Sequence, residues 1–344
     1  MPSRDEDYDY FCDSCDQGLY DDDAIQTDDH TYCAGCYETA EDRSPIKNYG
    51  HKPHPNFMLD DGSRSLYQVA HPSGQNGRLI LAMGIEQEVE FVNHRLSGSL
   101  EDNASKVLDD INTNGEIVYL KEDGSINYGF EIVSHPGTLG FFMNHFNWNG
   151  IESLSKRGFE SWNQRSCGLH IHMSRRAFKD DKHLFKFLVF IYKNPNQLIQ
   201  FAGRNSSYAK FDVDTFLNGL DSWGERLSVR GSSFMKMAKN ETINNERYCA
   251  VNLRNIETVE LRFFRPSLRA NTVKAALQFC DAAFNYTESV NTKEVMSEKA
   301  LSFEKFHQWV KEQKDKYQIL DNRIEERVKV IKPVIATDLE EITF

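Results

Sequence analysis

The pattern of apolar and polar positions predicts several strands that are apolar on one face only. Residues 78–91 form the first of these strands. Its second half alternates, and alternate side chains of a strand share a face. One face carries Ile85, Val89 and Phe91. The other carries Glu86, Glu88 and Glu90, about 6.5–7 Å apart at twice the rise per residue. A row of carboxylates of this kind must face either water or cations.

Three later segments repeat this pattern. Residues 128–136 place Glu131 inside an otherwise apolar strand, and residues 167–174 place His170 and His172 on one face. Residues 258–266 project Glu260 and Arg262 together. We therefore expect an α+β fold in which one curved antiparallel sheet forms a polar, carboxylate-rich cleft.

Helical periodicity predicts the scaffold that backs this sheet. Residues 182–203 are apolar nearly all round in their first half and are interrupted at Pro195. A second helix is expected at 273–286. Residues 303–334 are helical by pattern and highly charged, and they fit a bracing arm, an oligomer contact or a solvated helix.

Charge is distributed unevenly along the 344 residues. The net charge is −12, and residues 1–50 alone hold 14 acidic side chains against three basic ones. An acidic module is poorly suited to nucleic acid, because that affinity comes from Lys and Arg. No run approaches the roughly 18–20 apolar residues of a membrane span, and the acidic start does not resemble a secretory signal. We expect a cytoplasmic protein without a membrane partner.

The acidic segment contains four of the seven cysteines in two C-x-x-C pairs. Seventeen residues separate the pairs Cys12/Cys15 and Cys33/Cys36. This spacing is typical of a structural Zn²⁺ site with four thiolate ligands, similar to a zinc ribbon or half of a LIM finger. Two disulfides are the alternative, but nothing indicates an oxidising compartment. A short hairpin is expected between the pairs, around residues 24–27.

The polar face of the predicted sheet suits divalent cations. Four or five carboxylates with few bases nearby would repel one another unless such ions neutralised them. Oxygen-rich sets with one imidazole suit Mg²⁺ or Mn²⁺. His172 and Arg262 would add positive donors for a polyphosphate that arrives with the metal.

The order of these motifs resembles the glutamine synthetase and glutamate–cysteine ligase superfamily, and within it the amidoligases. The motifs are G-x-E-x-E at 84–88, E-I-V-S-x-P at 131–136, C-G-L-H-x-H at 167–172 and V-E-x-R at 259–262. The resemblance covers about residues 80–290. It implies a funnel-shaped antiparallel sheet with two or three divalent ions between ATP and a carboxylate substrate.

The resemblance also implies a role for each motif residue. Glu86 and Glu88 would bind separate ions, with Glu131 joining one ion and His170 and Glu260 joining the other. The nucleotide would lie against His172 and Ser174, and Arg262 would hold the transferring phosphoryl group. Asn252 and Arg254 resemble further substrate or phosphate contacts.

The function implied is an ATP-dependent carboxylate–amine ligase that forms an amide through an acyl phosphate. A metal-dependent hydrolase is one alternative, since H-x-H with glutamates also describes hydrolytic sites. An inactive adaptor that binds a partner through the zinc module is another. We expect a zinc module at 1–45, a connector at 46–79, a catalytic domain at 80–290 and a helical extension at 291–344. The acidic module would capture a macromolecular acceptor such as a basic protein.

Overall fold

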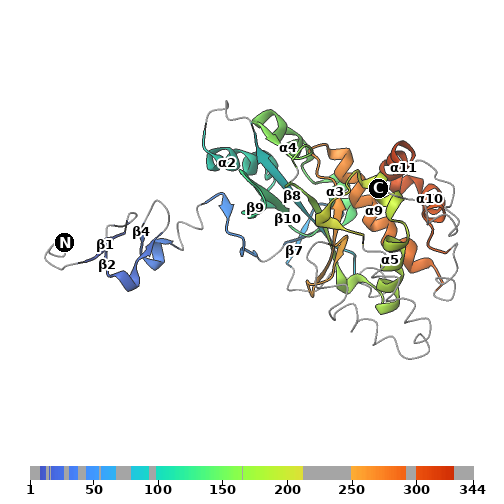
Figure 1. Cartoon of the computed structure of the whole chain (residues 1–344), viewed down its shortest axis with the longest axis horizontal. Coiled ribbons are helices and arrows are strands. Elements are labelled where there is room, and N and C mark those ends of the chain that lie inside the picture. Colours follow the sequence, from blue (N-terminus) through green and yellow to red (C-terminus); the bar gives the residue numbers. More distant parts are fainter. Residues whose placement is uncertain are drawn as a thin grey trace.

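A large sheet forms the centre of the molecule (Figure 1). The computed structural model describes residues 8–12, 15, 17–26, 31–37, 44–53, 56–66, 79–92, 98–164, 166–211, 249–291 and 300–328. Eight strands of these residues form the sheet: β5 (Ile46–Lys47), β8 (Met83–Phe91), β9 (Val118–Lys121), β10 (Gly129–Ser134), β11 (Phe159–Glu160), β12 (Leu169–Ser174), β13 (Val251–Asn252) and β14 (Thr258–Phe264). They follow the order β13-β14-β12-β8-β10-β9-β5, and β11 also pairs with β8. All four strands with chemical motifs are therefore neighbours near the middle.

The expectation of a wholly antiparallel sheet was wrong at one edge. Strand β5 runs parallel to β9, whereas the other pairings of this sheet are antiparallel. Short turns such as the one between β9 and β10 force an antiparallel pair, but a long connection leaves the direction free. Since β5 precedes β9 by some 70 residues, no turn fixes its direction, and the sheet is mixed.

The expected alternation of faces holds along β8. Ile85, Val89 and Phe91 are buried in the apolar core. Gln87 lies on the same face, where its amide donates to the hydroxyl of Ser161 at 2.6 Å. The glutamates of this strand are thereby directed to the opposite face.

A group of helices packs beside the sheet (Figure 1). It consists of α5 (Asp181–Lys193), α6 (Pro195–Ala202), α9 (Ala270–Ser289), α10 (Phe303–Glu312) and α11 (Lys314–Arg327). Rings from three of these helices meet in the core, with Phe306 4.9 Å from Phe190 and 5.6 Å from Phe279 between centroids. The expected break at Pro195 is confirmed, because this residue starts α6.

The charged C-terminal segment braces the fold rather than standing free in solvent. Helix α10 buries Phe306 and Val310, and α11 buries Leu320 and Ile324. Both helices contact α9. The end of the expected helix, residues 329–334, lies outside the described residues.

Helix α2 (Leu100–Ile111) was not expected from the sequence. Its N-terminus is fixed by a capping box in which Ser99 and Asp102 each accept the other's backbone N–H. The Asn114–Gly115 turn lies between this helix and β9. Two short helices, α3 (Leu139–Asn144) and α4 (Trp148–Ser153), and the 3₁₀ segments η3 (Leu154–Arg157), η4 (Arg175–Ala177) and η5 (Ser207–Ala209) complete this part.

The N-terminal segment consists of small two-stranded units. Strand β1 (Tyr10–Phe11) pairs with β2 (Gly18–Leu19), and β3 (Ile25–Gln26) pairs with β4 (Thr31–Tyr32). A 3₁₀ turn, η1 (Asp21–Asp23), lies between them. A further hairpin joins β6 (Asn56–Met58) to β7 (Arg64–Leu66). The part of the chain described by the structure contains no helix with the length and apolarity that a membrane crossing needs.

Candidate active site

Strand register brings the motif residues together in rows across the sheet. Glu88 of β8 lies opposite Glu131 of β10. His170 of β12 lies opposite Glu86, and His172 lies opposite Glu260 of β14. Side chains at paired positions share a face, so the four predicted motifs form one polar surface.

Glu86, His170 and Glu260 form the first of two ligand groups. Nδ1 of His170 lies 3.4 Å from Oε2 of Glu86 and 3.5 Å from Oε1 of Glu260. One ligand atom from each of these three residues lies within 4.8 Å of the others. Three strands, β8, β12 and β14, thus supply one oxygen-rich set around an imidazole nitrogen.

The second group uses the other side of the same histidine. Glu88, Glu131 and His170 also have ligand atoms within 4.8 Å of one another, and all three are buried. Nε2 of His170 is 4.0 Å from Oε1 of Glu88. Carboxylates with one imidazole fit Mg²⁺ or Mn²⁺. Glu260 thus lies with Glu86 and Glu131 lies with Glu88; the motif resemblance separates Glu131 from Glu260 but does not assign either of them to Glu86 or Glu88.

Ionisation of the carboxylates in the second group is unfavourable when no cation is bound. Burial raises the pKa of Glu131 well above its ordinary value, and the charge of Glu86 raises it further. Burial likewise raises the pKa of Glu88. Two carboxylates that resist ionisation beside each other are a suitable pair of donors for a divalent ion, because the ion removes the repulsion.

Glu86 and His172 form an ion pair next to the first group. Nε2 of His172 is 3.2 Å from Oε2 of Glu86. Burial opposes the charge on His172, but the carboxylates of Glu86 and Glu260 outweigh it and raise its pKa to about 9. The two histidines in turn hold the pKa of Glu86 well below its ordinary value, despite burial. Nδ1 of His172 lies 3.0 Å from the hydroxyl of Thr258.

A β-bulge adjusts the position of Arg262. The register of β12 and β14 shifts between Leu169 and Ile171, opposite Arg262. Bulges often redirect a side chain beside a functional site. The guanidinium of Arg262 donates to Glu260, and its buried Nε has no hydrogen-bond partner among the described residues. This orphaned donor fits a phosphoryl ligand at this side of the site.

The remaining predicted contacts lie at different distances from this cluster. Asn252 joins it directly, because its amide donates to Oε2 of Glu260 at 2.7 Å. Ser174 is buried, and its hydroxyl accepts the backbone N–H of Ala82. Arg254 is exposed, and its backbone N–H donates to Asn252.

Sequence reasoning missed two cations beside the second ligand group. Arg204, just after α6, lies near Glu88, and its charge partly offsets the burial that raises the pKa of that carboxyl. Lys121 of β9 lies opposite Glu131 in the register and acts on Glu131 in the same way. Lys121 could have been found from the β9–β10 turn, which fixes its register. Nothing in the sequence signals Arg204, whose position depends on helix packing.

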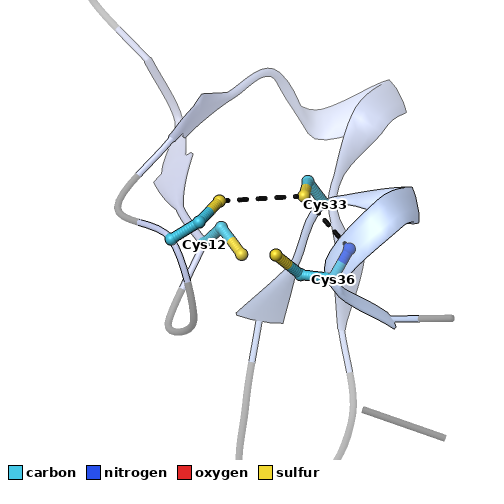
Figure 2. Close-up of side chains that lie close together, drawn as sticks. Cys12, Cys33 and Cys36 are labelled. Carbon is cyan, nitrogen blue, oxygen red and sulfur yellow. Dashed lines mark hydrogen bonds between the residues drawn. The ribbon is translucent and has the colours of Figure 1, made fainter. Parts of the chain in front are cut away.

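The four N-terminal cysteines converge as the spacing predicts. One sulfur from each of Cys12, Cys15, Cys33 and Cys36 lies within 4.8 Å of the others. Figure 2 shows the side chains of Cys12, Cys33 and Cys36 close together, with Cys36 on a short helical turn at residues 34–37. The Sγ atoms of Cys15 and Cys33 are 3.9 Å apart, well beyond a disulfide bond. Four convergent thiols fit Zn²⁺ in a closed structural site.

A cavity of about 720 Å³ lies elsewhere in the molecule. It is lined by residues of α3, α9 and the start of α11, including Lys274, Asp281 and Lys316. None of the predicted site residues lines it. The chemistry of the motifs therefore belongs to the polar face of the sheet and not to this cavity.

Comparison with known proteins gives a likeness to solved structures alone. No protein-family model matches this chain, and no curated protein matches it. A solved structure that resembles it is the complex between the prokaryotic ubiquitin-like protein Pup and its ligase PafA, with 12% sequence identity and a TM-score of 0.33. The match covers 72% of this chain and 63% of that one, so the chain spans less than two thirds of the length of this neighbour.

Proposed function

We propose that this chain is an ATP-dependent carboxylate–amine ligase. One observation carries the proposal: two groups of three ligands share His170 on a single face of the sheet. Sites of this composition hold two divalent ions a short distance apart, which is the arrangement used to transfer a phosphoryl group.

Each ligand group would hold one divalent ion. Glu86, His170 and Glu260 would hold the first, and Glu88 and Glu131 would hold the second. When bound, the ions would neutralise the phosphate charges and the attacking carboxylate. The side chains themselves orient the reaction, since phosphoryl transfer depends mainly on positioning and electrostatics.

The residues of β12 and β14 would bind the nucleotide. His172 is held in its charged form by Glu86, and its positive charge would attract a phosphate oxygen. Arg262 has a free buried Nε that would stabilise the charge of the transferring group. Ser174, Asn252 and Arg254 complete this side of the proposed site.

The reaction would proceed in two displacements. The substrate carboxylate attacks the γ-phosphate of ATP in line, ADP leaves, and an acyl phosphate forms. An amine then attacks the acyl carbon, phosphate leaves with the electron pair of the broken bond, and the amine proton is lost to solvent.

Hydroxylamine trapping tests this mechanism. Zinc-loaded full-length protein would be incubated with Mg²⁺, hydroxylamine and candidate carboxylic acids, with and without ATP. The ligase forms a hydroxamate only with ATP, and Glu88→Gln abolishes it. Glu160→Gln is the matched control, because Glu160 on β11 accepts from Gln164 outside the cluster. Product without ATP would instead favour a metal-dependent hydrolase.

The zinc module would select the acceptor. Its excess of acidic residues suits a basic macromolecule, so we infer that it captures a protein acceptor. Deletion of residues 1–45 should spare ATP binding and weaken use of that acceptor. Equal loss of both would make the module merely structural.

A further inference from the structure

Two cations flank the Glu88–Glu131 pair, and the proposed ion and nucleotide contacts leave both of them without a role. Arg204 lies at the β8 end of this pair, and Lys121 lies at the β9 end. Neighbouring strands are about 4.8 Å apart, so the backbones of Glu88 and Lys121, two strands apart, are separated by roughly 10 Å. Both cations can therefore reach the same ligand group.

Arg204 is held by the backbone of β14. Its Nη1 donates to the carbonyl oxygens of Arg262 at 3.2 Å and Phe264 at 3.3 Å. A guanidinium has five N–H donors in a planar fork, and among the described residues the remaining donors of Arg204 have no acceptor. The anchored fork is thus preorganised for an anion.

The absence of a side chain at Gly168 makes room for this arrangement. A Cβ atom at this position would lie 2.7 Å from Nη1 of Arg204, 2.8 Å from Nε2 of His170 and 3.3 Å from Oε2 of Glu88. These three groups therefore surround the same small space. Arg204 is placed directly against the second ligand group and not merely on the same surface.

Lys121 approaches the pair from the opposite side. It lies opposite Glu131 in the register, and its Nζ is 5.2 Å from the ring centre of Tyr49. No carboxylate among the described residues forms an ion pair with it. Its charge acts on Glu131 through space alone.

The charges around Glu88 and Glu131 determine which kind of ligand this part of the site attracts. A divalent ion would neutralise the two carboxylates of Glu88 and Glu131. Asp123, whose charge also acts on both carboxylates, would offset one of Arg204 and Lys121, which leaves one net positive charge beside a metal ion with open coordination positions. Such a site favours an anion, and a carboxylate matches the fork of an arginine in shape.

The direction of approach agrees with this assignment. The proposed nucleotide contacts lie on β12, β13 and β14, whereas Lys121 lies beyond β10 on the other side of the ligand groups. Attacking and leaving oxygens are roughly in line during phosphoryl transfer. The attacking group would therefore enter from the Lys121 side and extend toward Arg204, whose guanidinium is anchored to β14.

We propose that Arg204 and Lys121 form the subsite that binds the attacking carboxylate beside the Glu88–Glu131 ion. Arg204 contacts this carboxylate directly, and Lys121 completes the positive surroundings. The assignment of the bound anion as the attacking group rests on the proposed ligase function. The binding of an anion at this place does not.

Direct binding measurements separate the two proposals. The probes are Mn²⁺, followed by electron paramagnetic resonance, and glutarate, titrated calorimetrically into zinc-loaded, Mn²⁺-saturated full-length protein. In Arg204→Gln the glutarate dissociation constant should rise at least tenfold, whereas the Mn²⁺ affinity stays equal or increases because a neighbouring cation is gone. Lys121→Met should weaken glutarate about threefold or more, and Arg204→Lys should fall between wild type and Arg204→Gln.

Arg265→Gln is the matched control. Arg265 follows β14 directly, and its guanidinium donates to the carbonyl of Trp162 outside the site, so glutarate binding should not change. Unchanged glutarate affinity in Arg204→Gln, a parallel loss of Mn²⁺ and glutarate, or no glutarate binding by wild type would overturn the subsite. Wild type that binds glutarate but not MgATP would instead reject the ligase and leave the anion subsite standing.

Discussion

Glu88 and Glu131 lie directly opposite each other on neighbouring strands, and both are buried. Like charges at such positions destabilise a sheet. Because burial and the charge of Glu86 raise the pKa of Glu131, ionisation of this pair works against the fold when no ion is bound. This arrangement favours cation binding over stability of the metal-free protein.

Neutralising Glu131 should stabilise the metal-free protein. We expect Glu131→Gln to raise the free energy of unfolding at pH 7.5 in EDTA by on the order of 1 kcal/mol, because it removes a like-charge contact. The same variant should lose the stabilisation that Mg²⁺ gives to wild type. Urea titrations with and without Mg²⁺ measure both effects. A destabilised, still Mg²⁺-responsive variant would refute this account of the pair.

The ion pair of His172 should make stability depend on pH. Its pKa rises from 6.5 to about 9 in the folded state, so its stabilisation is fully present below pH 6.5 and is lost as the pH rises through 9. Metal-free wild type should lose on the order of 1–3 kcal/mol over this range. His172→Gln should flatten the dependence in chemical denaturation at several pH values. An equally steep curve in the variant would assign the effect to other groups.

A methyl group at Gly168 should damage the site without unfolding the protein. Gly168→Ala places Cβ under 3 Å from side-chain atoms of Arg204 and His170, which are flexible enough to move. Thermal unfolding should change by less than about 3 °C, whereas Mn²⁺ affinity should fall at least tenfold. Gly124→Ala is the control, because nothing lies within 4 Å of its new Cβ. Full Mn²⁺ affinity in Gly168→Ala would show that this space is not part of the site.

The four cysteines should bind one zinc ion. Purified wild type should contain about one Zn²⁺ per chain by mass spectrometry, and Cys33→Ser should lose it because the set is no longer complete. Binding of Mn²⁺ to the sheet should be unaffected. Cys280→Ser is the control, since this buried thiol lies in α9. Full zinc content in Cys33→Ser would contradict the assignment.

Strand alternation made much of the candidate site predictable. Successive side chains of a strand point to opposite faces, so residues two apart share a face. This rule places Glu86 beside Glu88 and His170 beside His172. Which residues meet across strands depends on register. The four motif strands are adjacent in one sheet, and this adjacency brings their polar residues together.

Other features depend on tertiary packing and so were not visible. Arg204 reaches the site because α6 ends beside β14, where two carbonyl oxygens hold its guanidinium. The role of Gly168 follows from the atoms around it and not from its backbone angles. The direction of β5 is set by its partner β9 and not by a local turn.

Calorimetric titration of ATP tests the central claim most directly. Zinc-loaded wild type would be titrated with ATP in the presence and absence of Mg²⁺, beside Glu88→Gln and the control Glu160→Gln. The account predicts binding that requires Mg²⁺, is weakened at least tenfold in Glu88→Gln and is unchanged in Glu160→Gln. Folded, zinc-loaded wild type that binds no ATP, or equal binding without Mg²⁺ and in Glu88→Gln, would contradict it.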